Sequence, residues 1–341
     1  MIPIKNIYHM LSYVFYELQK KGYESLEVEE FDNIFDLYSE ILILGMNKQI
    51  KRGIEKSYIE HEKQTPLIRG KMNITKSIRS YIKQKQVICQ YDIYDSNTIK
   101  NQIIKTTLYH LLKTDIKSIR KNKIKKIIYY LNDIELIDIN KIKWNFRYNR
   151  NNQTYILLLN ICYLIINGLL QKDEKGENKL ISLAEDNMPR LYEKFILEYY
   201  KREHPKIKTS SMQIKWQVDD EFDLFLPVMQ TDITLSQENK ILIIDAKYYK
   251  HTLQEHYETK TIHSNNLYQI FTYVKNKEEE LKDEEHTVSG MLLYAKTDEK
   301  DYPDYTYNMS GNKISTKVLE LNVDFKEIKN QLDNIVEEYF S

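Results

Sequence analysis

The sequence predicts two domains, an α+β domain followed by a mixed α/β domain. The chain has 341 residues, more than one hydrophobic core usually serves. The first half carries apolar residues at helical spacing between short strand-like runs, whereas from residue 189 onward apolar strands alternate with helices. Between the halves, QKDEKGENK at 171–179 has no apolar side chain. We therefore expect domains over 1–175 and 185–341, with the boundary within 171–188.

The first domain is expected to contain mainly helices. Residues 1–20 and 31–52 have apolar side chains at helical spacing. SYIEHEKQTPLIRGKMNI is typical of two strands joined through Thr65-Pro66 and followed by an amphipathic helix. QVICQYDIY predicts another strand, and two basic helices follow between Ser96 and Tyr130. YILLLNICYLIINGLL at 155–170 is short for a membrane span and contains two asparagines, so we expect a buried helix.

The second domain is expected to open with a helix that has Pro189 in its first turn. A group of strands comes next along the chain. It is followed by a helix near the middle of this half and by the run TVSGMLLYA, which predicts a buried strand. The last helix begins at Asp324, with Glu327 in the position of an acidic capping box. The expected strands of the group cover 206–215, 222–236 and 240–249, and the middle helix covers 265–281.

Positive charge is concentrated in one segment of a chain whose net charge is zero. Residues 41–150 sum to +15, whereas residues 1–40 sum to −5 and residues 151–341 to −10. A segment of that charge is a candidate surface for nucleic-acid phosphates. A biased use of lysine in the source genome is the alternative, but such a bias would not confine the excess to one third of the chain.

Composition excludes several other classes of protein. Hydrophobic residues make up 42% and charged residues 29% of the chain, as is usual for a soluble globular protein. Two cysteines, Cys89 and Cys162, are too few for a four-cysteine iron–sulfur site or a zinc site. The N-terminal run lacks the cleavage site of a signal peptide. We expect a cytoplasmic protein that does not bind a membrane.

The stretch TDITLSQENKILIIDAKYYK predicts a hairpin that carries chemistry. A turn centred on Glu238-Asn239 pairs residues whose numbers sum to 477, which places Asp232 opposite Asp245. Their Cβ atoms would then be roughly 4.5–5.5 Å apart on one face of the sheet. Lys247 follows two residues after Asp245 and shares that face.

Two carboxylates held this close repel one another unless a cation lies between them, and oxygen ligands suit Mg²⁺. A metal ion there polarises a phosphoryl oxygen and activates water, while Lys247 orients the nucleophile or offsets developing charge. The set therefore predicts hydrolysis of phosphodiesters. The alternative is an edge hairpin with a solvated Asp–Lys ion pair, because an acid-x-lysine triplet arises about seven times by chance in such a chain.

Two helices supply further candidates. In NNLYQIFTYVKN, Gln269 and Tyr273 are four residues apart and share one helix face, from which they could bind a phosphate or steady Lys247. Glu193 departs from the apolar stripe of the helix at Pro189 and could supply a third carboxylate. The alternatives are an ordinary half-exposed helix face for the first pair and a favourable interaction with the helix dipole for Glu193.

The order of these motifs resembles the PD-(D/E)XK nucleases, in particular their RecB-like branch. The second half is similar to the C-terminal half of McrC, the nuclease subunit of McrBC and LlaJI-like modification-dependent restriction systems, through RLYEKFILEYY, LPVMQTDITL, ILIIDAKYY and NLYQIFTYV. The first half is similar to segments of the same family through IPIKNIYHMLSY, LIRGKMN and YDIYDSNTIKNQIIKTTL. One departure is Thr231 before Asp232, where the family motif has proline.

The resemblance implies an α/β restriction-endonuclease-like domain, a mixed sheet flanked by helices, after the α+β domain. It implies Mg²⁺-dependent cleavage of double-stranded DNA, with Mn²⁺ as a substitute, by Asp232, Asp245 and Lys247. Glu193 matches the position of a further metal ligand, and Gln269 that of an accessory catalytic residue. A separate McrB-like AAA+ GTPase would recognise modified DNA and form a hetero-oligomer with this chain. The chain has no Gly-x-x-x-x-Gly-Lys-Ser/Thr loop, so we expect it to bind no nucleotide.

Two other functions stay open on the sequence. A stand-alone RecB-like repair nuclease would cut DNA without a partner driven by a nucleotide. A catalytically silent adaptor would use the basic domain to bind DNA, but it would have no physical reason to retain two repelling carboxylates.

Overall fold

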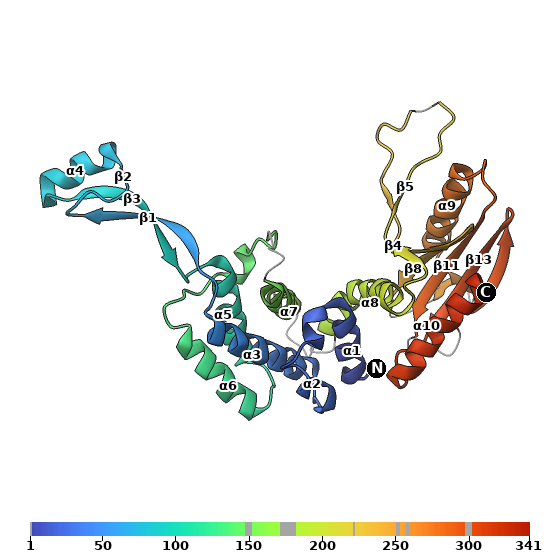
Figure 1. The fold of residues 1–341 in the computed structure, drawn as a ribbon, viewed down its shortest axis with the longest axis horizontal. Coiled ribbons are helices and arrows are strands. Elements are labelled where there is room, and N and C mark those ends of the chain that lie inside the picture. Colours follow the sequence, from blue (N-terminus) through green and yellow to red (C-terminus); the bar gives the residue numbers. More distant parts are fainter. Residues whose placement is uncertain are drawn as a thin grey trace. The chain divides into compact units, whose positions relative to one another are not determined.

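The computed structural model describes residues 2–146, 152–170, 182–220, 222–249, 253–256, 259–296 and 302–341. The chain divides into two compact units, whose elements Figure 1 labels. Unit 1 comprises Met1–Glu30 and Glu177–Ser341, and unit 2 comprises Phe31–Gly176. No helix among the described residues has both the length and the apolar character needed to cross a bilayer.

Unit 2 is built on packed helices. α3 (Ile34–Arg52) packs against α6 (Ser118–Tyr130) and α7 (Gln153–Leu170), and α5 (Ile99–Leu111) packs against both of these. α7 is the apolar run expected to form a buried helix, and Leu158 on it is fully buried. That prediction is confirmed, because the asparagines do not interrupt the helix.

A buried ion cluster joins α3 to α6. The guanidinium of Arg120, which is 0% exposed, lies 2.7 Å from Asp36 Oδ2 and 3.0 Å from Glu40 Oε2. Both acids precede the segment 41–150, so they offset part of its positive charge inside the unit. Unit 2 as a whole still carries a net charge of +12.

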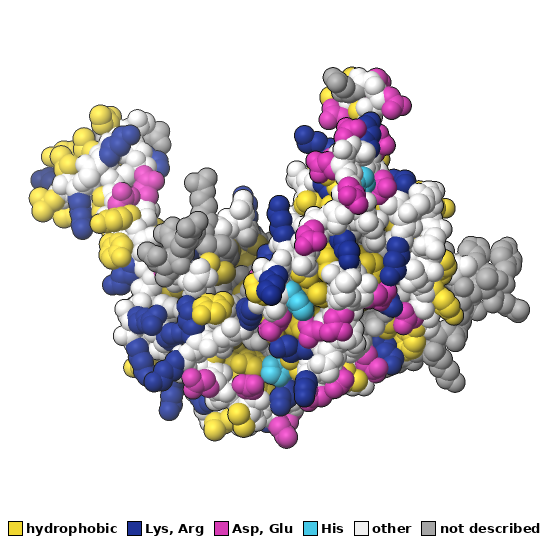
Figure 2. All heavy atoms as spheres, turned by 45° about the vertical axis from the view of Figure 1, so that its right-hand side comes forward, with side chains coloured by type: hydrophobic (Ala, Val, Ile, Leu, Met, Phe, Trp, Pro, Cys, Tyr) yellow, Lys and Arg dark blue, Asp and Glu magenta, His cyan; other side chains and the backbone are white. Residues whose placement is uncertain are grey.

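A lobe of strands and one helix, which we call the strand lobe, spans residues 57–95 of unit 2. β3 (Val87–Asp95) is the central strand and pairs antiparallel with β1 (Ser57–Thr65) and β2 (Lys71–Met72). α4 (Ile74–Gln84) packs on β3. Exposed hydrophobic side chains gather on this lobe, at the upper left in Figure 2: Leu67, Ile68, Ile74, Ile78 and Tyr81.

Unit 1 contains a mixed six-stranded sheet, in the order β12-β13-β11-β8-β7-β4. The three central strands β13, β11 and β8 run parallel, and every other neighbouring pair is antiparallel. The strands of this sheet are β4 (Lys208–Ser210), β7 (Ile233–Gln237), β8 (Lys240–Lys247), β11 (Thr287–Ala295), β12 (Tyr305–Met309) and β13 (Asn312–Leu319). Two short ribbons accompany it, β5 (Gln213–Ile214) with β6 (Met229–Gln230) and β9 (Leu253–His256) with β10 (Thr259–Ile262).

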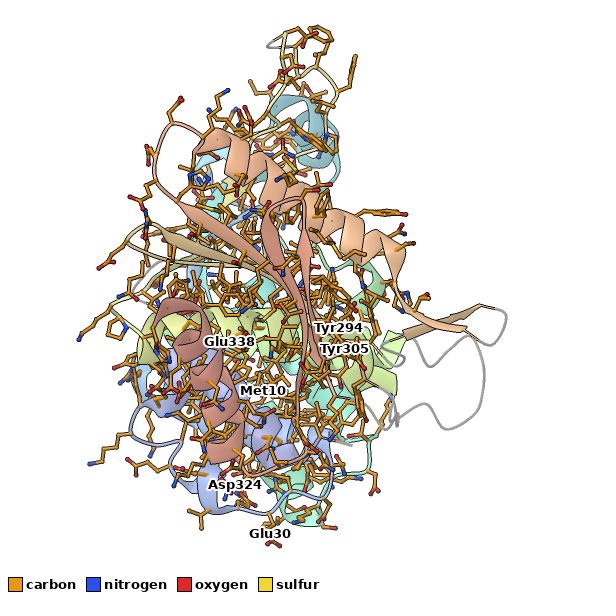
Figure 3. All side chains as sticks on the ribbon, turned by 90° about the vertical axis from the view of Figure 1, so that its right-hand side faces the viewer. Met10, Glu30, Tyr294, Tyr305, Asp324 and Glu338 are labelled. Carbon is orange, nitrogen blue, oxygen red and sulfur yellow. The ribbon has the colours of Figure 1, made fainter. Side chains whose placement is uncertain are left out.

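Helices cover both faces of this sheet. α9 (Ser264–Glu280) packs against β8, β11 and β13, and α10 (Phe325–Phe340) lies on the opposite side of the same strands (Figure 1). Gly290 on β11 allows α9 to approach closely, since a Cβ there would lie 2.8 Å from side-chain atoms of Ile270 and Val274. α10 is capped by Asp324, labelled in Figure 3, the residue expected at its start, whose side chain accepts a hydrogen bond from the Lys326 amide.

The N-terminal residues belong to unit 1, which differs from the expected first domain over 1–175. α1 (Ile4–Val14) packs on α8 (Ser182–Glu203), and the Tyr13 hydroxyl donates to Glu203 at 2.6 Å. The Asn6 amide group donates to the carbonyls of Leu321 and Val323. Apolar spacing predicts a helix but not its partner, so these long-range contacts could not be read from the sequence. η1 (Tyr16–Gln19) and α2 (Ser25–Val28) complete this N-terminal segment.

Three other expectations about unit 1 need correction. α8 begins at Ser182, so Pro189 lies inside the helix and not in its first turn. The single strand expected over 222–236 is instead two strands in different sheets, β6 and β7, and the residues before Met229 form the loop of the β5–β6 ribbon. The strands β12 and β13 were not expected. The polar run 171–179 lies outside the described residues.

Candidate active site

The hairpin of β7 and β8 has the register that the sequence predicts. The residue numbers of each facing pair add up to 477, from Gln237 with Lys240 to Ile233 with Ile244. A two-residue turn at 238–239 sets this register, and Glu238 adopts the left-handed conformation with φ 53°. Asp232 directly precedes β7, and it lies close enough to Asp245 for its negative charge to act on that carboxyl.

The two carboxyl groups occupy different environments at the end of this hairpin. Asp245 is 1% exposed, whereas Asp232 is half-buried. Asp232 Oδ2 accepts a hydrogen bond from the Ala246 amide at 2.9 Å, which fixes its side chain beside β8. Asp245 Oδ2 is buried and lies 2.8 Å from Lys247 Nζ in an ion pair, but it accepts no hydrogen bond of good geometry from any described residue.

A hydrogen-bonded chain connects Lys247 to α9. Lys247 Nζ donates to Gln269 Oε1 at 3.1 Å, and Gln269 Nε2 donates to the Tyr273 hydroxyl at 3.0 Å. The Tyr273 hydroxyl donates in turn to the carbonyl of Gln230, two residues before Asp232, at 3.2 Å. The structure thus brings together Asp245, Lys247, Gln269 and Tyr273, as the spacing on strand and helix predicts.

Glu193 on α8 also faces this group of charges. Burial and the negative charge of Asp232 raise the pKa of the Glu193 carboxyl to about 6. Lys247 acts in the opposite direction on the same carboxyl. Glu193 therefore lies within electrostatic reach of the hairpin, where it is half-buried among groups of both signs.

The charges of the site influence one another strongly. Burial and the charge of Asp232 raise the pKa of Asp245 to about 7, although Lys247 lowers it in part. Burial lowers the pKa of Lys247, but the attraction of Asp245 outweighs burial and leaves that pKa above its ordinary value. Lys247 therefore stays protonated near neutral pH, whereas the carboxyl pair has too much negative charge for its surroundings.

The donor set fits a hard divalent cation. Asp245 Oδ2 is a buried oxygen that lacks a hydrogen-bond donor among the described residues, and it lies on the face that Asp232 shares. Mg²⁺ is bound through one or two carboxylates together with several waters, so two aspartates suffice. Within the described part of the chain, no group of three or more histidine, cysteine or acidic residues is arranged to hold a metal.

Thr231 has a structural role at the position where the resembling motif has proline. It is 1% exposed, and its backbone amide donates to the Met212 carbonyl at 2.9 Å. Its Oγ1 accepts a hydrogen bond from the Met212 amide at 3.0 Å and contacts Thr234 Oγ1 at 3.0 Å. These bonds tie the β5–β6 ribbon to the residue before Asp232. A proline could make none of them through its own nitrogen or side chain.

Replacing Thr231 by valine is expected to lower the free energy of unfolding by about 1–3 kcal/mol, because the part-buried Met212 amide loses its acceptor. Thr231→Ser keeps the hydroxyl and should lower the free energy of unfolding by a smaller amount. Chemical denaturation of both variants followed by circular dichroism measures the difference. Equal stability of the valine and serine variants would contradict the role given to the hydroxyl.

The raised pKa of Asp245 predicts how stability changes with pH when divalent cations are removed by EDTA. In the unfolded chain an aspartate titrates at about 3.9, so between about pH 4 and 7 the folded protein holds a proton that the unfolded chain has lost. The stabilisation that this bound proton gives to the folded protein is present at low pH and is lost as the pH rises through 7.

Asp245→Asn should therefore be more stable than the unsubstituted protein at pH 8 by about 1 kcal/mol or more, since one pKa unit corresponds to about 1.4 kcal/mol. The two proteins should differ little at pH 4. Thermal melts of both proteins across this range provide the test, and a variant that is less stable at pH 8 would show that the charged form is not penalised.

Two contacts of the site use backbone groups, which a side-chain pattern cannot reveal. The Ala246 amide holds Asp232, and the Gln230 carbonyl holds Tyr273. The only sequence signal for them is their position next to the aspartates.

The chain is similar to known proteins in sequence and in fold. The model of the McrBC 5-methylcytosine restriction system component family matches residues 5–295. The chain is 29% identical over 347 residues to the type IV methyl-directed restriction enzyme EcoKMcrBC of Escherichia coli K12, a match covering 99% of this chain and 98% of that protein.

Among solved structures, a chain of a half-complex from the tetradecameric assembly of Thermococcus gammatolerans McrB AAA+ hexamers with bound McrC has a similar fold. Its TM-score is 0.50 at 14% identity, over 98% of this chain and 76% of that chain. The family model covers well over half of the sequence and agrees with the resemblance in both halves. The chain belongs to the McrBC 5-methylcytosine restriction system component family.

Proposed function

We propose that this chain is the Mg²⁺-dependent endonuclease subunit of a McrBC-type restriction complex, and that unit 1 is a PD-(D/E)XK nuclease domain. The observation that carries this proposal is the buried, incompletely hydrogen-bonded Asp245 Oδ2 between Lys247 and the side of Asp232. An inert surface hairpin would place this acid in solvent. Burying Asp245 and most of Lys247 beside the half-buried Asp232 is costly unless the site uses their charge.

The residues of this chain have distinct roles in the proposed reaction. Asp232 and Asp245 would hold the metal ion, which supplies Lewis-acid polarisation of a phosphoryl oxygen. Lys247 stays protonated and lies where it stabilises negative charge that develops on the scissile phosphate. Gln269 and Tyr273 position Lys247 through two hydrogen bonds in series. Glu193, with its raised pKa, supports the metal ion or a bound water.

We also propose a McrB-like AAA+ GTPase as partner. A similar fold occurs in an assembly of McrB AAA+ hexamers with bound McrC. This chain has no Gly-x-x-x-x-Gly-Lys-Ser/Thr loop of its own, so nucleotide hydrolysis would come from the partner. The exposed apolar side chains of the strand lobe form the type of surface that protein partners cover.

A cleavage assay with the purified chain and a McrB-like GTPase tests the proposal. Methylated plasmid should be cut only when both proteins, GTP and Mg²⁺ are present, and Mn²⁺ should replace Mg²⁺. Cleavage by this chain alone without a nucleotide would favour a stand-alone nuclease. Binding to the GTPase without cleavage under any metal condition would favour a silent adaptor.

A further inference from the structure

Unit 2 contains a cavity of about 520 Å³ that has no part in the site of unit 1. It is lined by the first turn of α5, the start of β1 and the segment 137–146. The α5 turn lies within YDIYDSNTIKNQIIKTTL, one of the runs that resemble the family in the first half. The proposed nuclease chemistry leaves this run without a role. We call the cavity the α5 pocket.

The charge of the α5 pocket is positive. Lys100, Lys141 and Lys143 line it, against one acid, Glu55. Lys100 Nζ lies 2.6 Å from Glu55 Oε1, so these two charges offset each other. Lys141 Nζ lies 3.7 Å from Asp138 Oδ2, and the lysine side chain is 81% exposed. An exposed ion pair at such a distance contributes little free energy. Lys141 and Lys143 are therefore the cations that a ligand would meet.

The wall of the α5 pocket at Glu55 is preformed. Glu55 Oε2 accepts from the Asn152 amide group at 2.8 Å, and the Asn101 amide group donates to the Glu55 carbonyl at 2.9 Å. The Tyr155 hydroxyl donates to Asn101 Oδ1 at 2.6 Å, and both residues are 1% exposed. A ligand would find this wall already ordered, so binding would require little rearrangement there.

The remaining lining is apolar. Ile99, Ile137 and Phe146 face the same cavity as the lysines. Trp144 lies next to this side, with its ring centroid 6.2 Å from that of Phe146. Cations beside an aromatic and aliphatic surface suit a group that joins a phosphate to a flat ring, since every nucleobase has a face for stacking.

We propose that the α5 pocket binds one nucleotide unit of a DNA strand, with its phosphate on Lys141 and Lys143 and its base or sugar against Ile99 and Phe146. The inference rests on the proposed function insofar as DNA is the substrate. Unit 2 has a net charge of +12, which attracts DNA at long range, and the pocket adds a fixed point of contact. An acidic peptide would use the lysines but not the apolar side.

Fluorescence anisotropy with the full-length protein, a short labelled duplex and the matching single strand tests this proposal. EDTA is present, so no cleavage occurs. The double variant K141E/K143E should bind at least one of the two probes about 10- to 100-fold more weakly. The slope of log K against log salt should fall by about 2, because each lysine removed corresponds to about one phosphate contact.

The matched control is K125E/K126E, which makes the same charge change at exposed positions of α6 outside the pocket lining. It should weaken binding by about threefold or less. Equal weakening by the two double variants would overturn the proposal, because net charge alone would then explain binding. Thermal melts check that both variants remain folded.

A spectroscopic readout distinguishes the pocket from general electrostatics. In a Trp216→Phe background, Trp144 is the remaining tryptophan, and DNA should quench or shift its emission at the concentration that saturates anisotropy. Phe146→Ala should reduce this signal. Saturation by a free nucleoside monophosphate without any response to DNA would overturn the proposal in favour of a small-molecule site, and a response to a poly-glutamate peptide alone would do so in favour of a protein ligand.

The outcome is separable from the nuclease proposal. An Asp245→Asn protein that still cuts DNA while DNA perturbs Trp144 would overturn the nuclease assignment and keep the pocket. A K141E/K143E protein that binds DNA as tightly as the unsubstituted chain would overturn the pocket and keep the nuclease assignment.

Discussion

Replacing Asp245 by asparagine is expected to lower DNA cleavage on the order of a thousandfold, while the protein stays folded. Asparagine has nearly the same shape, but it lacks the negative charge that a divalent cation requires. Loss of metal-assisted charge stabilisation costs several kcal/mol, and each 1.4 kcal/mol corresponds to about a tenfold change in rate. Single-turnover cleavage of methylated plasmid with the GTPase partner measures the effect.

The control is Glu238→Gln, which removes a negative charge from the exposed turn of the same hairpin. Its cleavage rate should be unchanged. Asp232→Asn should lower the cleavage rate as far as Asp245→Asn does. The double variant should cleave only slightly more slowly than either single variant, because both acids serve one metal ion. Cleavage by Asp245→Asn at the rate of Glu238→Gln would disprove the assignment.

The core of the candidate site was predictable because strand geometry is periodic. The two-residue turn fixes which residues of the hairpin face each other, namely those whose numbers add up to 477. Because side chains alternate between the two faces of a strand, Lys247 then lies on the same face as Asp245. Spacing of four on a helix likewise predicts that Gln269 and Tyr273 lie together. What the pattern left open was whether α9 faces the hairpin at all. The contact between Lys247 and Gln269 supplies that information.

The fold was predictable only where local pattern decides it. TVSGMLLYA forms β11 over Thr287–Ala295, as its apolar run indicates, because both faces of this strand are buried. The placement of α1 in unit 1 was not predictable, since it depends on Asn6 meeting carbonyls more than three hundred residues away. The early start of α8 was hidden by Pro189, which usually marks a helix N-terminus.

Lys247→Arg is expected to be the second most damaging change, with cleavage lowered by about a hundredfold or more. The lysine side chain is only 14% exposed, and its ammonium fits between Asp245 Oδ2 and Gln269 Oε1 at 2.8 and 3.1 Å. A guanidinium is planar and larger, so it cannot point its charge at both oxygens from the same backbone position. It would also bind a carboxylate through two parallel hydrogen bonds and so compete with the metal ion for Asp245.

Lys240→Arg is the matched control, since Lys240 lies at the other end of β8 and donates to the Ser341 carbonyl in an exposed contact. It should cut DNA normally. Raising the Mg²⁺ concentration separates the two causes of the Lys247→Arg defect. If competition for Asp245 dominates, added Mg²⁺ should restore part of the rate, whereas loss of charge placement at the phosphate would leave the rate low at every concentration. Normal cleavage by Lys247→Arg at low Mg²⁺ would mean that Lys247 only balances the buried charge of Asp245, and transition-state stabilisation would then have to come from another cation.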